Sequence, residues 1–284
     1  MTTDSSAQKG RVPAWATAAF KQMLDQTERL EDVVHLAMRG IGIVQKAHEA
    51  VELLALIDGD VTSTDAEERL DRAKRESDLA EREVADGFPV LHSQAVVTLW
   101  ALLEACVRRL VADWLTNEPT SLQNTPFDKV KVRLAEYERL EKAERMLYVA
   151  DALEREVAAS LQTGVGRFES LLEALRLSGD VPDLLRRELY ELSQVRNAIV
   201  HRGGSVDRRL AEACPWLSLT PGELVLISHK MFGKYAGAVH AYLILLICRV
   251  AERFGVDVSH NRAAVITKYG SAHGLLASGP QETQ

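Results

Sequence analysis

Helix-breaking residues are scarce in this chain, and their placement constrains the fold more than any other feature. The 284 residues include only eight prolines and seventeen glycines, and these fall in clusters that separate long runs rich in Leu, Ala, Glu and Arg. Because such runs favour helices over strands, the sequence predicts an all-α protein. Hydrophobic residues make up 46% of the chain, so a sizeable core can form.

The cysteines and the apolar runs indicate the environment of the protein. The three cysteines lie far apart without a CxxC motif, which is typical of a reducing compartment and indicates no zinc site. The most apolar run, Ala238 to Cys248, is too short to cross a bilayer, and the N-terminus does not resemble a signal peptide. With no HExxH motif, Walker lysine or Gly-x-Ser-x-Gly elbow, we expect a cytoplasmic protein without membrane contact, metal or cofactor.

The formal net charge of −7 argues against a protein that clamps nucleic acid over its whole surface. The charge is uneven, however, because residues 181–284 hold 12 Lys+Arg and 9 Asp+Glu, a local +3, while residues 1–180 carry −10. A polyanion should therefore approach the C-terminal third, where six arginines gather: Arg186, Arg187, Arg196, Arg202, Arg208 and Arg209. The alternative for Arg186, Arg187 and Arg209 is that they only solvate helix faces.

The first 88 residues are expected to form an accessory or partner-binding helical region. Apolar spacing predicts two amphipathic helices between residues 13 and 57, joined near Arg39–Gly42. Thr64 and Glu67 fit a capping box at the start of a highly charged helix that reaches Asp86. This helix is either a solvated outer helix or an arm that awaits a partner.

The rest of the chain alternates long helices with short connections. Its most apolar helix, Ala95–Leu115, should be buried on nearly every side. The other expected elements are a loop at 116–126, helix at 129–160 with a break near Lys142, a short helix that ends at Leu177, helices at 205–213 and 229–254, a short extended piece at 224–227, and a frayed tail at 255–284.

Residues 181–204 read as one helix, with a proline in its first turn and a Gly-Gly pair at its end. At about 100° per residue, Tyr190, Asn197 and His201 share one face of this helix, whereas Arg196 falls at the edge of its apolar stripe. Burying a guanidinium without a partner costs several kcal/mol. Arg196 is therefore predicted to have a partner or a function.

Glu104, in the middle of the most apolar helix, is a candidate partner for Arg196. One interpretation is an ordinary ion pair between Glu104 and Arg108, one turn further along the same helix. The other is that Glu104 meets Arg196 across a contact between two helices and fixes that side chain. The sequence leaves both open.

Residues 196–201, Arg-Asn-Ala-Ile-Val-His, resemble the motif of the HEPN domains (higher eukaryote and prokaryote nucleotide-binding). In that family an Arg, usually followed by a polar residue, precedes a His near the end of a helix, with four to six residues between them. The resemblance covers roughly Pro89 to Phe254. It implies a multi-helix HEPN-like bundle at 89–254, with residues 1–88 as an N-terminal addition and 255–284 as a tail.

The resemblance also implies a function. HEPN domains place two motif helices face to face, so a homodimer with one composite cleft is expected, acting as a metal-independent endoribonuclease. Cleaving RNA needs no metal, because the 2′-hydroxyl beside each phosphodiester is a nucleophile. The resemblance suggests a bacterial toxin or an antiviral-defence effector, whose further partner would be an antitoxin or a defence complex.

The residue types fit such chemistry. His201 can move protons at neutral pH, Arg196 can neutralise charge on the phosphorane oxygens, and Asn197 can orient the imidazole or hold the phosphate. The expected supporting residues are Glu104 and Tyr190, and the expected substrate-binding residues are Arg202 and Arg208. The alternative for His201 is a favourable interaction with the helix dipole.

A rival reading has no catalysis. In it the same motif binds RNA or a nucleotide, or only builds a dimer, in a subunit or adaptor of a larger complex. A structural adaptor whose acidic N-terminal region docks to a partner is a third reading.

Overall fold

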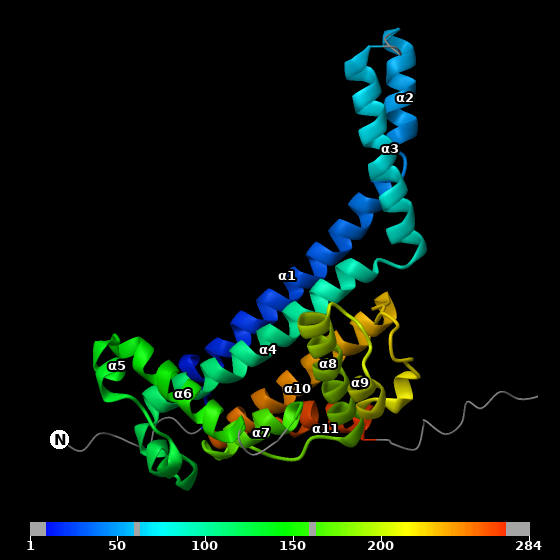
Figure 1. The fold of residues 1–284 in the computed structure, drawn as a ribbon. Helices are drawn as coiled ribbons and strands as arrows, with labels where there is room; N and C mark the ends of the chain where they lie inside the picture. Colours follow the sequence, from blue (N-terminus) through cyan, green and yellow to red (C-terminus); the bar gives the residue numbers. More distant parts are fainter. Residues whose placement is uncertain (1–9, 60–62, 159–162, 271–284) are drawn as a thin grey trace, which may run out of the picture.

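The computed structural model describes residues 10–59, 63–158 and 163–270, and within these ranges the protein is all-helical, as the sequence predicts (Figure 1). The described residues form eleven α-helices and no strand, and one isolated antiparallel bridge joins Ser205 to Leu224. The α-helices are α1 (Ala14–Val44), α2 (Ala47–Asp58), α3 (Thr64–Ala85), α4 (Pro89–Asn117), α5 (Leu134–Arg139), α6 (Lys142–Ala158), α7 (Val165–Glu173), α8 (Asp183–Arg202), α9 (Arg208–Ala213), α10 (His229–Arg253) and α11 (Ser259–Tyr269), and the short 3₁₀ helices are η1 (Pro119–Gln123), η2 (Thr125–Lys129) and η3 (Pro215–Leu217).

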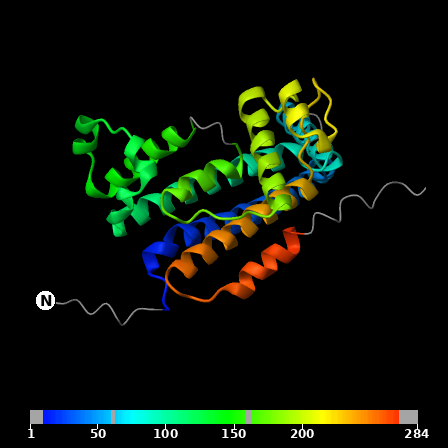
Figure 2. The same ribbon diagram turned by 90° about the horizontal axis from the view of Figure 1, so that it is seen from below.

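Helix α4 forms the centre of the bundle. Its side chains Leu99, Leu103 and Val107 are completely buried, and α1, α6, α8 and α10 all pack against it. Figure 2 shows α10 (orange) running beside α1 (blue), with α11 (red) along the outer side of α10. Because α4 is apolar around most of its circumference, it can be covered from several sides, as the sequence predicts.

Helix α1 shares this core, so the expected boundary at residue 88 does not separate the first helix from the bundle. Phe20 and Met23 of α1 are each 1% exposed and belong to the same hydrophobic cluster as the side chains of α4. Helix α2 and the part of α3 that pairs with it project from the bundle as an antiparallel hairpin (Figure 1), while α3 also packs against α1.

The joint between α1 and α2 lies later than the sequence suggests. Helix α1 continues through Gly40–Gly42 and ends at Val44, so the predicted break at the glycines is wrong. The hydroxyl of Ser77 in α3 fixes the actual joint, because it lies 3.1 Å from the carbonyl oxygen of Val44 and 3.0 Å from that of Gln45, and accepts from the backbone N–H of His48 at 3.2 Å. A glycine within a helix costs only about 1 kcal/mol, so a distant contact can decide where the helix ends.

Helix α3 begins with a serine cap and packs through small residues. The side chain of Ser63 accepts a hydrogen bond from Ala66 N at 3.2 Å, so the cap is Ser63, and the Thr64 cap predicted from the sequence is wrong. Ala66, Ala73 and Ala80 are buried. Small side chains at these positions allow the neighbouring helices to approach closely.

The C-terminal region is more ordered than the sequence suggests. Helix α11 packs against α10 and α8 and buries Val265 and Tyr269, so the predicted fraying is wrong for residues 259–269. The two buried side chains lie four residues apart and therefore on one face of the helix, which packs against the bundle. Residues 271–284 lie outside the described residues.

Within the described residues, α10 is the one helix that is long and apolar enough to cross a membrane by length and composition. The sequence suggests that its apolar run is too short, but the helical window extends beyond Ala238 to Cys248. In the structure 61% of that window is buried inside the bundle, and Tyr235 and Tyr242 are completely covered. Helix α10 is therefore a core element of the fold.

The connections near the end of α8 follow the predicted outline. Val225 and Ile227, in the stretch expected to be extended, are buried, and Val225 N donates to Gly204 O at 2.8 Å. The expected break near Lys142 falls between α5 and α6. The last residues of the helix predicted at 129–160 lie outside the described residues.

Candidate functional site

Helix α8 holds the motif in a fixed orientation. It starts after Pro182 and ends at Gly203, whose φ of 62° is left-handed, and Gly204 N donates to Ala198 O at 3.0 Å. This arrangement satisfies carbonyls at the helix end. The inner face is completely buried at four positions: Leu185, Leu189, Leu192 and Val195. The rotation of the helix, and with it the direction of each motif side chain, is therefore set by the core.

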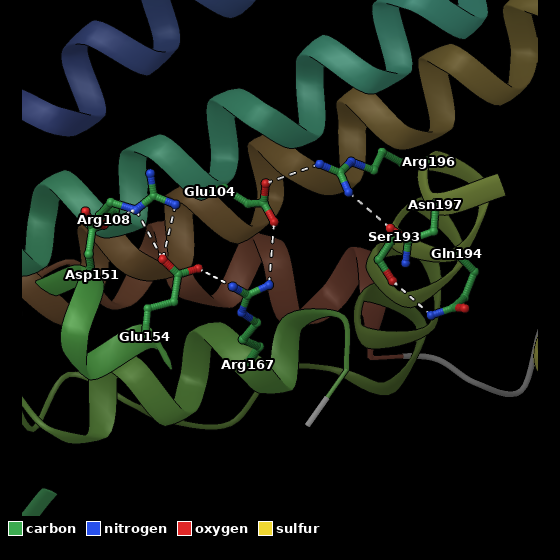
Figure 3. Close-up of polar contacts among 9 residues, drawn as sticks. All are labelled: Glu104, Arg108, Asp151, Glu154, Arg167, Ser193, Gln194, Arg196 and Asn197. Carbon is green, nitrogen blue, oxygen red and sulfur yellow. Dashed lines mark hydrogen bonds and ion pairs between the residues drawn. The ribbon is translucent and has the colours of Figure 1, made fainter. Parts of the chain in front are cut away.

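Arg196 lies where α8 meets α4, and its side chain is 24% exposed. Its Nη2 is 3.8 Å from Glu104 Oε2, and its Nη1 donates to Asn197 Oδ1 at 3.1 Å (Figure 3). Its Nε is buried and has no hydrogen-bond partner among the described residues. The guanidinium is therefore held from two sides, with part of its donor capacity unused.

Glu104 turns towards Arg196, as the second interpretation of the sequence predicts. Arg108, the alternative partner, instead contacts Asp151 at 3.0 Å and Glu154 at 3.1 Å on α6, so the predicted pair between Glu104 and Arg108 is wrong. Two carboxylates of α6 thus lie close enough to pair with Arg108 in place of Glu104. Because Asp151 and Glu154 belong to another helix, the spacing of residues along α4 does not predict these contacts.

Arg167, at the start of α7, is a member of this site that the sequence does not single out. Its Nη1 is 3.8 Å from Glu104 Oε1, and its Nη2 makes a close ion pair with Glu154. Figure 3 shows that alternating charges run from Arg108 through Glu154, Arg167 and Glu104 to Arg196. Arg167 follows a Gly-Val-Gly turn, and only the packing of α7 on α4 brings it here.

A groove of about 330 Å³ lies on the other side of α8, between α8 and α9. Of the residues predicted from the sequence, Tyr190, Asn197, His201 and Arg202 line it. The full lining is Thr163, Tyr190, Gln194, Asn197, Ala198, His201, Arg202, Arg209, Leu210 and Ala213. Asn197 and His201 are exposed and therefore accessible to a ligand.

Arg196 and His201 do not converge within one copy of the chain. Five residues correspond to about 140° around a helix, so Arg196 points towards α4 while His201 lies on the groove beside α9. Asn197 connects the two places, because its oxygen accepts from Arg196 and its side chain lines the groove. One copy thus presents Arg196 and His201 on two different faces near the end of α8.

Of the two arginines expected to bind substrate, Arg202 lines the groove and Arg208 does not. Arg202 lines the groove and makes a close ion pair with Asp207. Arg208 is outside the lining, and its Nε donates to Glu212 at 2.6 Å, one turn along α9. Arg209, which the sequence allows to be a solvated surface residue, lines the groove instead. Arg208 and Glu212 are four residues apart, a spacing that favours an ion pair along one helix. This spacing is the sequence signal that Arg208 pairs with Glu212 and does not line the groove.

Two further observations limit the chemistry of the groove. Burial, followed by the influence of Cys214, raises the pKa of Tyr190 above its usual value near 10, so its hydroxyl stays protonated at neutral pH. Within residues 10–59, 63–158 and 163–270, no group of three or more His, Cys, Asp or Glu side chains is arranged to hold a metal ion. The protonated phenol of Tyr190 can therefore act in the groove as a hydrogen-bond donor or acceptor.

No protein-family model, no curated protein and no solved structure matches this chain.

Proposed function

We propose that this protein is a metal-independent endoribonuclease of HEPN type, with a composite site made by two copies of the chain. The observation that carries the proposal is the paired Arg196, held by Glu104 at 3.8 Å and joined through Asn197 to the face that presents His201. A guanidinium held at the rim of a core has a high cost unless it is paired or used. Arg196 is held there five residues before His201, which lies at the exposed end of the same helix.

The reaction uses a nucleophile that RNA itself supplies. The 2′-oxygen attacks the neighbouring phosphorus and the bond to the 5′-oxygen breaks, which gives a 2′,3′-cyclic phosphate and a 5′-hydroxyl. In this scheme one His201 removes the proton of the 2′-hydroxyl, and His201 of the second copy gives a proton to the leaving 5′-oxygen. Arg196 stabilises the charge that builds on the phosphorane oxygens, and Asn197 holds the phosphate or the imidazole.

The different directions of Arg196 and His201 favour a second copy. Two helices α8 that meet around a two-fold axis can bring Arg196 of one copy towards His201 of the other. The surface beside the end of α8 suits such a contact, because a groove there is lined by three exposed aliphatic side chains, which we name the apolar patch: Val90, Leu224 and Leu226. Burying apolar area of this kind is the usual driving force of a homodimer interface.

A cytoplasmic role in bacterial toxin or antiviral-defence systems belongs to the same proposal and rests on the resemblance of the motif. An antitoxin or a defence complex would then be the further partner. Arg202 and Arg209, which line the groove, are the cations that would attract RNA towards the motif.

A second candidate is a non-catalytic subunit or adaptor. The observation in its favour is the α2–α3 hairpin, where α2 has no buried residue and leaves Leu53, Leu56 and Ile57 exposed. An apolar helix face of this kind is typical of a protein-binding surface.

A cleavage assay with two active-site variants separates these functions. Purified protein is incubated with RNA in EDTA, and we expect cleavage by the wild type and a loss of about 100-fold or more in His201→Ala and in Arg196→Ala, the usual effect of losing such a group. The matched control is His260→Ala, at an exposed position of α11, which should cut normally. RNA binding without cleavage by the wild type would favour the subunit or adaptor.

A further inference from the structure

The groove beside α9 contains a polar stripe that catalysis alone does not explain. Tyr190, Gln194, Asn197 and His201 follow one another at spacings of four, three and four residues, so all four project into the groove from α8. His201 and Asn197 have roles in the proposed reaction. Gln194 and the ring of Tyr190 do not, although they form the end of the stripe away from the motif.

One hydrogen bond and one longer polar contact orient the two amides in this stripe. Asn197 Oδ1 accepts from Arg196 Nη1 at 3.1 Å, and Gln194 Nε2 donates to Ser193 Oγ at 3.5 Å (Figure 3). Among the described residues, neither amide side chain makes another hydrogen bond. The NH₂ group of Asn197 and the carbonyl oxygen of Gln194 are therefore left for a ligand, one as donor and the other as acceptor.

We propose that this groove binds the base of the nucleotide next to the cleaved phosphodiester and reads the edge of that base through Gln194 and Asn197. The proposal rests on the proposed endoribonuclease function. A donor and an acceptor three residues apart on a helix are neighbours, and every RNA base presents an adjacent donor and acceptor on its Watson–Crick edge. The ring of Tyr190, only partly buried, offers a stacking surface.

The remaining lining fits a nucleotide as well. Arg209 and His201 provide cationic or proton-donating groups for the phosphate, while Ala198, Leu210 and Ala213 provide an apolar floor. The volume of about 330 Å³ lies at the lower end of the range for small-molecule sites, about 300–1,000 Å³, and so suits one nucleotide.

The first test measures binding of the four nucleoside 3′-monophosphates to the full chain by isothermal titration calorimetry. We expect affinities that differ between bases by about tenfold or more, the discrimination that a good pair of hydrogen bonds provides. Gln194→Leu should abolish this difference, whereas Gln194→Glu, which keeps an acceptor at the same place, should keep the order of preference with weaker binding. The control is Gln26→Leu, at an exposed position of α1.

The second test maps cleavage positions on a mixed RNA substrate, after circular dichroism has shown that each variant is folded. Wild type and Gln26→Leu should share one base preference beside the cut, and Gln194→Leu should cut with that preference lost. Cleavage whose preference survives in Gln194→Leu, or equal binding of all four nucleotides, would overturn the base-reading groove and leave the endoribonuclease standing. Base-selective binding that Gln194→Leu abolishes, without cleavage of any RNA, would support the groove and refute the endoribonuclease.

Discussion

At the scale of single residues, the environment of Arg196 is the most informative feature of the molecule. Its guanidinium is shared between Glu104 and Asn197, and the same carboxylate also faces Arg167. One negative charge therefore lies between two positive ones, each at 3.8 Å. Glu104 is expected to hold Arg196 in place while leaving it available to an anion.

Replacing Glu104 tests this arrangement. In Glu104→Gln two arginines lose their shared carboxylate, so we expect the free energy of unfolding to fall by about 1 kcal/mol, since the pair is loose and partly exposed. The rate of RNA cleavage should also fall, because Arg196 then keeps only its contact with Asn197. Urea unfolding and the cleavage rate measure the two effects. The control Glu138→Gln removes a more exposed partner of Arg145 and should change neither.

A second arginine, Arg249, is more deeply buried than Arg196 and connects segments of the bundle. Arg249 contacts Glu169 at 2.8 Å and donates to the carbonyl oxygens of Leu177 and Asp180, so it ties α10 to the connection between α7 and α8. Its side chain is only 8% exposed. Burial, with the carboxylate of Glu169 next in effect, also raises the pKa of Tyr242, which keeps that hydroxyl a donor to Glu169.

Arg249→Leu is expected to lower the free energy of unfolding by about 3 kcal/mol, because it leaves a buried carboxylate unpaired. Thermal and urea unfolding measure the loss. Arg253→Leu, at an exposed position of the same helix, should stay within about 0.5 kcal/mol of the wild type. An equally small effect of Arg249→Leu would show that this network does not stabilise the fold.

At the scale of helices, the junction of α1, α4 and α10 contains three imidazoles. His92 of α4 is completely buried, its Nδ1 lies 3.0 Å from Gly87 O, and its Nε2 lies 3.4 Å from His229 Nδ1. The rings of His35 and His229 are 5.9 Å apart. Because a carbonyl oxygen only accepts, Nδ1 of His92 carries the hydrogen. Burial first, then His229 and more weakly His35, lower the pKa of His92 below its usual value of 6.5.

This junction should lose stability on acidification. The folded state binds the proton of His92 less readily than the unfolded state, so stability is complete above about pH 6.5 and falls as the pH drops below the ordinary pKa of histidine. We expect the urea midpoint to fall between pH 7.5 and pH 5.5, and the fall to be smaller in His92→Phe. His260→Gln, at an exposed site of α11, should keep the wild-type dependence. An unchanged dependence in His92→Phe would remove His92 as its cause.

The sequence predicts those helices whose boundaries are set locally. Helix α8 has its proline start and glycine stop, α10 has Ser228 as its cap, and α4 is recognisable from its apolar content. Hydrophobic periodicity does not predict features that depend on contacts between segments far apart in the chain. The joint fixed by Ser77, the burial of α11 on α10, and the placement of Arg167 and Arg209 all arise from packing between segments far apart in the chain.

At the scale of the whole molecule, the proposed composite site depends on how two copies of the bundle could meet. The bundle presents the motif at one end of α8, with the apolar patch on one side and the groove on the other. The α2–α3 hairpin projects away from the bundle (Figure 1) and is available to a different partner. The apolar patch, where the proposed dimer would form, and the exposed apolar face of α2 are therefore two different surfaces of the molecule.

Charged substitutions in the apolar patch test the dimer. Leu224→Glu combined with Leu226→Glu should convert the proposed dimer into monomers and should also abolish cleavage, because a carboxylate in an apolar interface is poorly solvated. Light scattering at several concentrations reports the mass. Val132→Glu, an exposed aliphatic position elsewhere, should remain dimeric and active. Monomers that still cut RNA at the wild-type rate would rule out the composite site.

The chemistry of the cleaved ends tests the central claim most directly. RNA is treated with the wild-type protein in EDTA, and the termini of the fragments are identified by mass spectrometry. The account predicts cleavage with 2′,3′-cyclic phosphate and 5′-hydroxyl ends, since the 2′-oxygen is the nucleophile and His201 and Arg196 replace a metal. Intact RNA, cleavage that EDTA abolishes, or fragments with 3′-hydroxyl and 5′-phosphate ends would contradict it.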